Sequence, residues 1–172
     1  MITIKKNIRY FLYKNTPVIL LFISVLNEID FNNLELKYFS FNFAYILIFH
    51  YNLKRDGGIG YVSVFIAGLF NDVINGIPMG ISSLCYLLLC FFAAYLRNIT
   101  LRPNLIKDGI FFLVTILFIN SLLFVALNFI FNYELDYFNQ IINITFTFLL
   151  YFLFSNLFDY FENYLVGSIN AR

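Results

Sequence analysis

Long apolar runs separated by short polar breaks make up almost the whole chain. The apolar segments lie at about 16–29, 38–53, 61–75, 78–96, 110–131 and 141–158. The fifth segment is long enough, at roughly 1.5 Å of rise per residue, to cross a hydrocarbon core of about 30 Å. The pattern therefore predicts an all-α integral membrane bundle of six transmembrane helices. We expect one domain over residues 1–172, with a cytoplasmic tail at 1–15.

The first three segments are short for a bilayer. Flanking residues could extend them, they could thin the membrane, or they could be partly re-entrant. The first segment begins either at Thr16, where Pro17 suits the first helical position, or near Ile8, with the Lys14 side chain reaching the headgroups. The sequence leaves these alternatives open.

The composition excludes an ordinary soluble domain. The chain of 172 residues is 61% hydrophobic and 12% charged, whereas soluble domains are roughly 45–50% apolar and 25% charged. The formal net charge is +1, and no basic patch or stripe is present that would attract a phosphate backbone. We therefore expect membrane lipid as the solvent and no nucleic-acid partner.

The distribution of basic residues predicts the orientation. With the N-terminus inside and six crossings, ten of the eleven Lys and Arg residues face the cytoplasm, and Lys37 alone lies outside. The cytoplasmic set is Lys5, Lys6, Arg9, Lys14, Lys54, Arg55, Arg97, Arg102, Lys107 and Arg172. Because such a bias determines topology, we expect a multi-pass protein with both termini in the cytoplasm.

One charged residue, Asp72, stands well inside an apolar run. Gly68, Asp72, Gly76 and Gly80 follow one another at a spacing of four, which places small residues on one helix face. This stripe predicts the close approach of a second helix. Pro78 and the glycines predict a tight outer turn between the third and fourth segments.

Asp72 has two interpretations. A charged side chain within a membrane is costly, so it is a candidate for recognition of a partner subunit or a ligand. Alternatively, its carboxylate accepts hydrogen bonds from backbone N–H groups freed at the turn. The two roles are compatible, because a turn held rigidly by Asp72 could itself be a docking surface.

The same segment carries a resemblance. GLFNDVINGIPMG at 68–80, followed by Leu84, resembles the G-L-x-x-D-x-x-x-G-x-P-x-G-x-x-x-L signature of the rod shape-determining MreD family. The candidate partner-binding residues are Gly68, Leu69, Asp72, Gly76, Pro78 and Gly80. The family often carries a proline in the preceding inner loop, where this chain has Asp56, Gly57 and Gly58.

The resemblance implies a non-enzymatic scaffold in the bacterial inner membrane that helps to organise peptidoglycan synthesis and cell shape. Its implied partners are MreC and, less directly, the MreB filament and the wall synthase pair of glycosyltransferase and penicillin-binding transpeptidase. No cofactor or metal is implied.

A second function fits the same helix number. Six helices in fewer than 200 residues also suit the substrate-binding subunit of an energy-coupling-factor vitamin transporter, and MreD-like chains are expected to resemble that fold. This alternative predicts a ligand cavity on the outer side, near Asp72 and Pro78.

An intramembrane enzyme is a third class. It needs a nucleophile and a base within reach, or a set of metal ligands. Ser82 and Ser83 lie in the fourth segment, but the single histidine, His50, is predicted at the opposite side of the membrane with no second metal ligand near it. We therefore expect no catalytic residues and interpret His50 as packed or interfacial.

Polar residues in the last two segments recur at helical spacing. Asn120 and Asn128 share one face of the fifth segment, and Asn143 and Thr147 share one face of the sixth. These pairs predict hydrogen bonds between helices.

Overall fold

The computed structural model describes residues 15–26, 41–55, 58–100, 104–132 and 137–170, and the side chains of 164–170 lie outside that description. Every regular element in these ranges is helical, as the apolar pattern predicts. The helices are Asn15–Leu26, α2 (Phe43–Lys54), α3 (Tyr61–Asn75), α4 (Ile81–Ile99), α5 (Leu105–Val125) with its π-helical continuation η2 (Ala126–Ile130), and α6 (Tyr137–Asn170).

Three of these helices are long and apolar enough to cross a membrane: Ile81–Ile99, Leu105–Ile130 and Tyr137–Asn163. Asn15–Leu26 and α3 are apolar but shorter. The predicted segment 61–75 coincides with α3. The described part of the first helix is Asn15–Leu26, and a start near Ile8 falls on residues outside the description. Most of the predicted tail, 1–14, lies outside the described residues.

Polar caps explain where other helices begin. The Asn42 side chain accepts a hydrogen bond from Tyr45 N, so α2 begins at Phe43. The Asn104 side chain accepts from Ile106 N, so α5 begins at Leu105, before the apolar run at 110. An asparagine oxygen satisfies an N–H that has no partner within the helix, and apolar periodicity does not show this.

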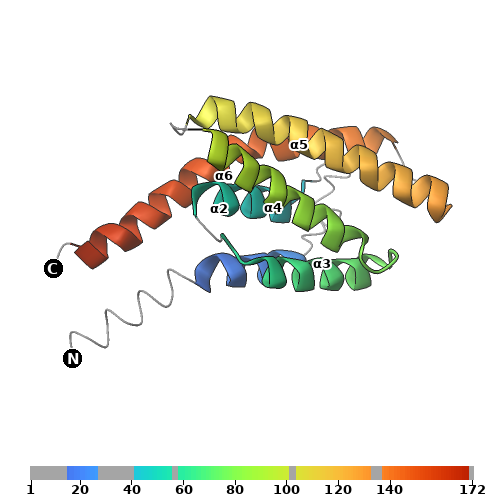
Figure 1. The fold of residues 1–172 in the computed structure, drawn as a ribbon, viewed down its shortest axis with the longest axis horizontal. Helices are drawn as coiled ribbons and strands as arrows, with labels where there is room; N and C mark the ends of the chain where they lie inside the picture. Colours follow the sequence, from blue (N-terminus) through green and yellow to red (C-terminus); the bar gives the residue numbers. More distant parts are fainter. Residues whose placement is uncertain (1–14, 27–40, 56–57, 101–103, 133–136, 171–172) are drawn as a thin grey trace, which may run out of the picture.

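The helices form one bundle around α2 (Figure 1). α4 packs against α2, α3 and α5, and α6 packs against α2 and α5. Every residue of α2 from Ala44 to Leu53 is buried. The helix is thus enclosed by protein on all sides rather than exposed along one face.

Aromatic packing fills the junction of α2, α5 and α6. The ring of Phe112 stacks on Tyr151 with centroids 4.5 Å apart, and the ring of Phe49 lies 5.0 Å from Phe112 and 5.9 Å from Tyr151. All three side chains are fully buried. Such aromatic contacts favour one arrangement of the three helices beyond the burial of area alone.

Candidate functional site

The hairpin of α3 and α4 contains all the residues that carry the sequence signature. Asp72 lies in the last turn of α3 and is fully buried. Its Oδ2 accepts a hydrogen bond from Gly80 N at 2.6 Å, and its Oδ1 accepts one from Ser82 N at 2.9 Å. The carboxylate of one helix therefore caps the first turn of the next, where the helix dipole favours negative charge. The structural interpretation of Asp72 is confirmed, and partner recognition stays a prediction.

Gly68 brings the two helix backbones into contact. A Cβ atom at Gly68 would lie 2.4 Å from Ser83 Cα and 2.6 Å from Ser83 N. The Ser83 hydroxyl donates to Phe65 O at 3.0 Å, and Asn71 Nδ2 donates to Ser82 Oγ, also at 3.0 Å. The close approach predicted from the small-residue stripe is present at this one glycine, where a side chain would force the helices apart.

Gly76 and Gly80 form the predicted turn but not the predicted packing stripe. A Cβ atom on either would meet nothing within 4 Å, so neither glycine permits a close approach. Both have positive φ angles, +63° and +100°, which glycine adopts at little cost. Gly76 ends α3, and its N–H donates to the Asp72 carbonyl. The glycine stripe beyond Gly68 therefore forms the turn rather than a packing face.

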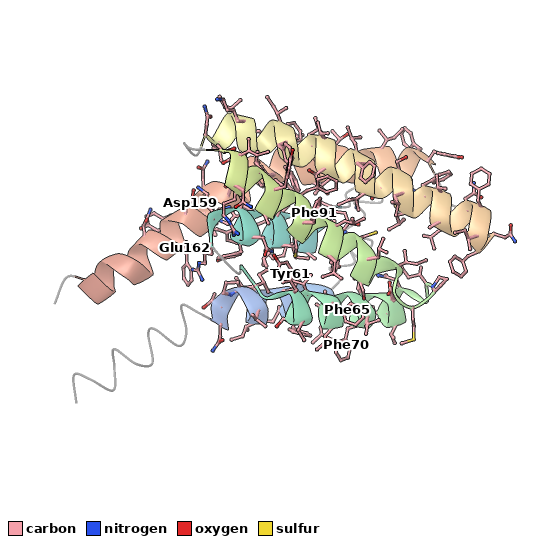
Figure 2. All side chains as sticks on the ribbon, in the orientation of Figure 1. Tyr61, Phe65, Phe70, Phe91, Asp159 and Glu162 are labelled. Atoms are coloured by element: carbon pink, nitrogen blue, oxygen red, sulfur yellow. The ribbon has the colours of Figure 1, made fainter. Side chains whose placement is uncertain are left out.

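The signature also has an outward side. Leu69 and Pro78 are half-buried, whereas Met79 at the tip of the turn is 71% exposed. Figure 2 shows Phe65 and Phe70 along the outer edge of α3. The hairpin thus holds Asp72, Ser82 and Ser83 inside and presents mainly apolar side chains to its surroundings.

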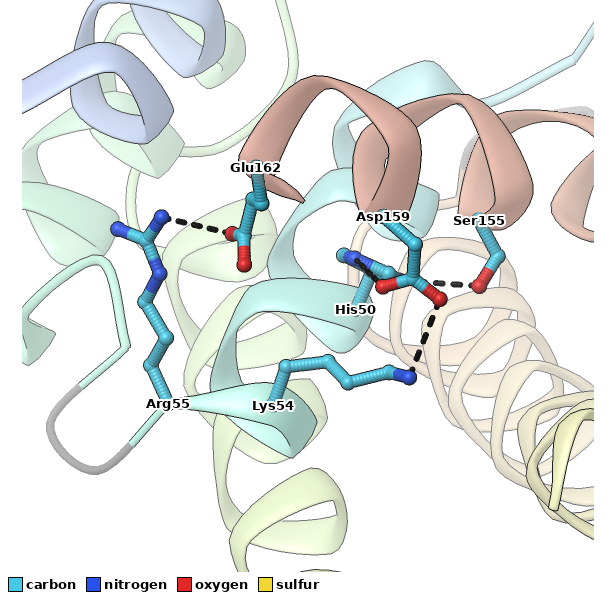
Figure 3. Close-up of polar contacts among 6 residues, drawn as sticks. All are labelled: His50, Lys54, Arg55, Ser155, Asp159 and Glu162. Atoms are coloured by element: carbon cyan, nitrogen blue, oxygen red, sulfur yellow. Dashed lines mark hydrogen bonds and ion pairs between the residues drawn. The ribbon is translucent and has the colours of Figure 1, made fainter. Parts of the chain in front are cut away.

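A second polar cluster joins α2 to α6 at the opposite end of the bundle (Figure 3). His50 Nδ1 lies 3.1 Å from Ser155 Oγ, and His50 Nε2 lies 3.5 Å from Asp159 Oδ1. Asp159 Oδ2 also pairs with Lys54 Nζ at 3.2 Å. His50 is packed, as predicted, but the sequence did not reveal its partners on α6.

Two arginines extend this cluster. Arg55 Nη2 lies 2.7 Å from Glu162 Oε1, and each side chain is 16% exposed. Arg97 of α4 donates to the carbonyls of Asn52 and Arg55. Because those carbonyls belong to the C-terminal end of α2, Arg97 provides the positive charge that this end favours.

Asp108 is a second buried carboxylate that the sequence analysis did not single out. It lies in the first turn of α5, because this helix begins at Leu105 rather than at 110. Asp108 is therefore buried in the bundle although it lies outside the predicted apolar run at 110–131.

Serine, histidine and aspartate at Ser155, His50 and Asp159 are the residue types of a hydrolase triad, but their environment differs. Ser155 and His50 are fully buried, and Asp159 shares its carboxylate with Lys54. A substrate would reach neither the hydroxyl nor the imidazole unless α2 and α6 separated. Among the residues described, no three His, Cys, Asp or Glu side chains gather as metal ligands.

Within the described ranges, the hydrogen bonds between helices predicted for the last two helices form in α6 but not in α5. Asn120 Nδ2 donates to Ile116 O within α5, and no bond from it to another helix is observed in the part of the chain that the structure describes. Thr147 fulfils the prediction, because its hydroxyl accepts from the backbone N–H of Asn42 at 2.9 Å while donating to Asn143 O.

The chain matches no protein-family model, no curated protein and no solved structure. The class of the protein is therefore defined by its fold and not by relatives. It is an all-helical protein with three helices, among the residues described, that are long and apolar enough to cross a membrane.

Proposed function

We propose that this chain is a non-enzymatic, multi-pass scaffold of the bacterial rod complex, which crosses the inner membrane six times with both termini in the cytoplasm. The observation that carries the proposal is the Asp72 carboxylate, which binds Gly80 N and Ser82 N. The residues of the MreD-like signature thereby form one rigid hairpin. A rigid hairpin with an apolar exterior is suited to be a docking surface for partner proteins in the membrane.

The direction of the helices supports six crossings. Contacts between α2 and α6 join Asn42 to Thr147, His50 to Ser155 and Lys54 to Asp159, always 105 positions apart. A constant separation means that α2 and α6 run in parallel. Parallel helices with α3, α4 and α5 between them fit three intervening crossings.

The charges support the orientation. Lys54, Arg55 and Arg97 gather at one end of the bundle, and Lys107 lies in the first turn of α5 beside Asp108. The Asp72 turn lies at the other end (Figure 1). An end rich in Lys and Arg is the end that stays in the cytoplasm.

Depletion and co-purification test the proposal. Loss of the protein should round a rod-shaped cell, and MreC should co-purify with the tagged chain from membranes. Asp72→Ala should recover less MreC than Asn75→Ala, which alters an exposed residue in the same helix turn. Normal rods after depletion, with no MreC recovered, would refute the scaffold.

The vitamin-binding alternative predicts a different result for the tagged protein purified from membranes. A substrate-binding subunit should retain a vitamin through purification and release it on denaturation, independently of MreC. A stoichiometric vitamin in the purified protein would replace the scaffold proposal with a transport function.

A further inference from the structure

The outer face of α3 is apolar from Tyr61 to Ile74. No exposed side chain of α3 is charged, and the exposed apolar ones are Tyr61, Val62, Phe65, Ile66, Phe70, Val73 and Ile74. Figure 2 labels Tyr61, Phe65 and Phe70 on α3. Tyr61 and Phe70 are nine positions apart and lie at opposite edges of this broad face. α5 presents a similar surface, with Ile106, Ile110, Val114, Leu117, Phe118 and Val125 exposed, continued by Phe129 and Ile130 of η2. Phe70 also contacts Phe22 of the helix Asn15–Leu26, with ring centroids 6.1 Å apart. In a membrane the rest of both faces contacts lipid.

These two apolar faces differ in length. α3 has 15 residues and is about 22 Å long, whereas Leu105–Ile130 has 26 residues and is about 39 Å long. Gly60 before α3 and Gly76 after it have φ angles of +89° and +63°. The helix therefore ends at both sides, because neither backbone conformation continues a helix.

α3 has little freedom to compensate by moving. Gly68 holds its backbone against Ser83, and Asp72 is bonded to the first turn of α4. Sliding or tilting α3 alone would break these contacts. Figure 1 shows η2 reaching beyond the α3–α4 turn, so the two apolar faces end at different heights on that side.

Polar groups mark both ends of the short face. Tyr61 is exposed in the first turn of α3, and Asn75 is exposed in the last. A tyrosine hydroxyl belongs at the membrane interface, and an exposed amide within hydrocarbon would lack a hydrogen-bond partner. The two markers are 14 positions apart, about 21 Å along the helix.

We propose that the α3 face holds the adjoining bilayer thinner than its resting core of about 30 Å, with lipid acyl chains as the occupant of this face. A bilayer accommodates a short apolar surface by local thinning. The face of α5 and η2 is long enough to span the resting core, so the bilayer beside it does not have to thin. The bilayer is then thinner beside α3 than beside α5. This inference rests on the membrane crossing of α3 in the proposed function.

Spin-label depth profiles test the gradient in the full-length chain in dioleoyl phosphatidylcholine vesicles. Single cysteines replace exposed residues along α3 and, as the matched control, along α5 and η2, in a background with Cys85→Ala and Cys90→Ala. Collision with oxygen and with a polar nickel chelate locates both boundaries of the hydrocarbon. The distance between boundaries should be about 20 Å along α3 and about 30 Å along α5.

Equal distances on the two helices would overturn the proposal. So would low collision rates for both reagents on α3 alone, because they would show that protein rather than lipid covers this face. A Met79→Cys variant separates this failure from failure of the topology. Labelling of Met79→Cys by an impermeant maleimide from the outer side of intact cells supports the crossing, and its absence there would refute the proposed function as well.

Discussion

His50 on α2 and Ser155 on α6 lie 3.1 Å apart and are separated by 105 positions in the chain. The same separation recurs between Asn42 and Thr147 and between Lys54 and Asp159. On α2 these positions advance by eight and then four residues, so they lie on one side of the helix. α2 and α6 are therefore parallel neighbours, held in register from one end of α2 to the other.

Cysteine pairs should report this register. The pairs 42 with 147 and 54 with 159, introduced in the Cys85→Ala, Cys90→Ala background, should cross-link with a short bis-maleimide in intact membranes. The exchanged pairs, 42 with 159 and 54 with 147, should not, because they lie at opposite ends of α2. Comparable yields from matched and exchanged pairs would contradict the parallel arrangement.

Removing the Asp72 carboxylate should destabilise the hairpin. Asp72→Ala leaves the part-buried Gly80 N and the buried Ser82 N without their acceptor, at a cost of about 2–3 kcal/mol. Thermal unfolding of the purified protein in detergent should show a clear loss of stability, and Asn75→Ala, which alters an exposed amide, should show little. Equal midpoints for the two variants would mean that the cap contributes nothing.

Two glycines of the signature should respond differently to asparagine. Gly76→Asn should be tolerated, because asparagine adopts positive φ and nothing lies near the site. Gly68→Asn should prevent normal packing, since even a Cβ atom would lie 2.4 Å from Ser83 Cα. Expression and thermal stability in detergent distinguish the two. A stable Gly68→Asn protein would show that α3 and α4 separate easily.

Arg97 should be sensitive even to a conservative change. Its guanidinium donates to two carbonyls at the end of α2, and a lysine has one nitrogen on a flexible stem. Arg97→Lys should recover part of the stability that Arg97→Ala loses, which we expect to be about 1–3 kcal/mol. Lys107→Ala, at an exposed position in α5, is the control. If Lys107→Ala lost as much stability as Arg97→Ala, net charge rather than capping would explain the effect.

The hairpin could be predicted because its determinants are close in sequence. Asp72, Gly80 and Ser82 lie within one segment, so the order of residue types indicates both the turn and its cap. The role of Gly76 could not be separated from that of Gly68, because equal spacing on a helix does not show whether the chain continues as a helix.

The cluster at the other end could not be predicted for a different reason. His50 and Lys54 are four apart, and so are Ser155 and Asp159, which indicates a polar face on each of two helices. Nothing in either pattern shows that these faces meet, because helices separated by 105 positions pair only through packing of the whole bundle.

The complete enclosure of α2 bears on how the protein is made. A helix of 12 residues that carries His50, Asn52 and Lys54 is a poor substrate for insertion into lipid by itself. Its neighbours α4, α5 and α6 are synthesised later, so α2 leaves the ribosome before the helices that shelter it. We expect it to wait at the insertion machinery or the membrane surface, and to take its central place only once α6 has arrived.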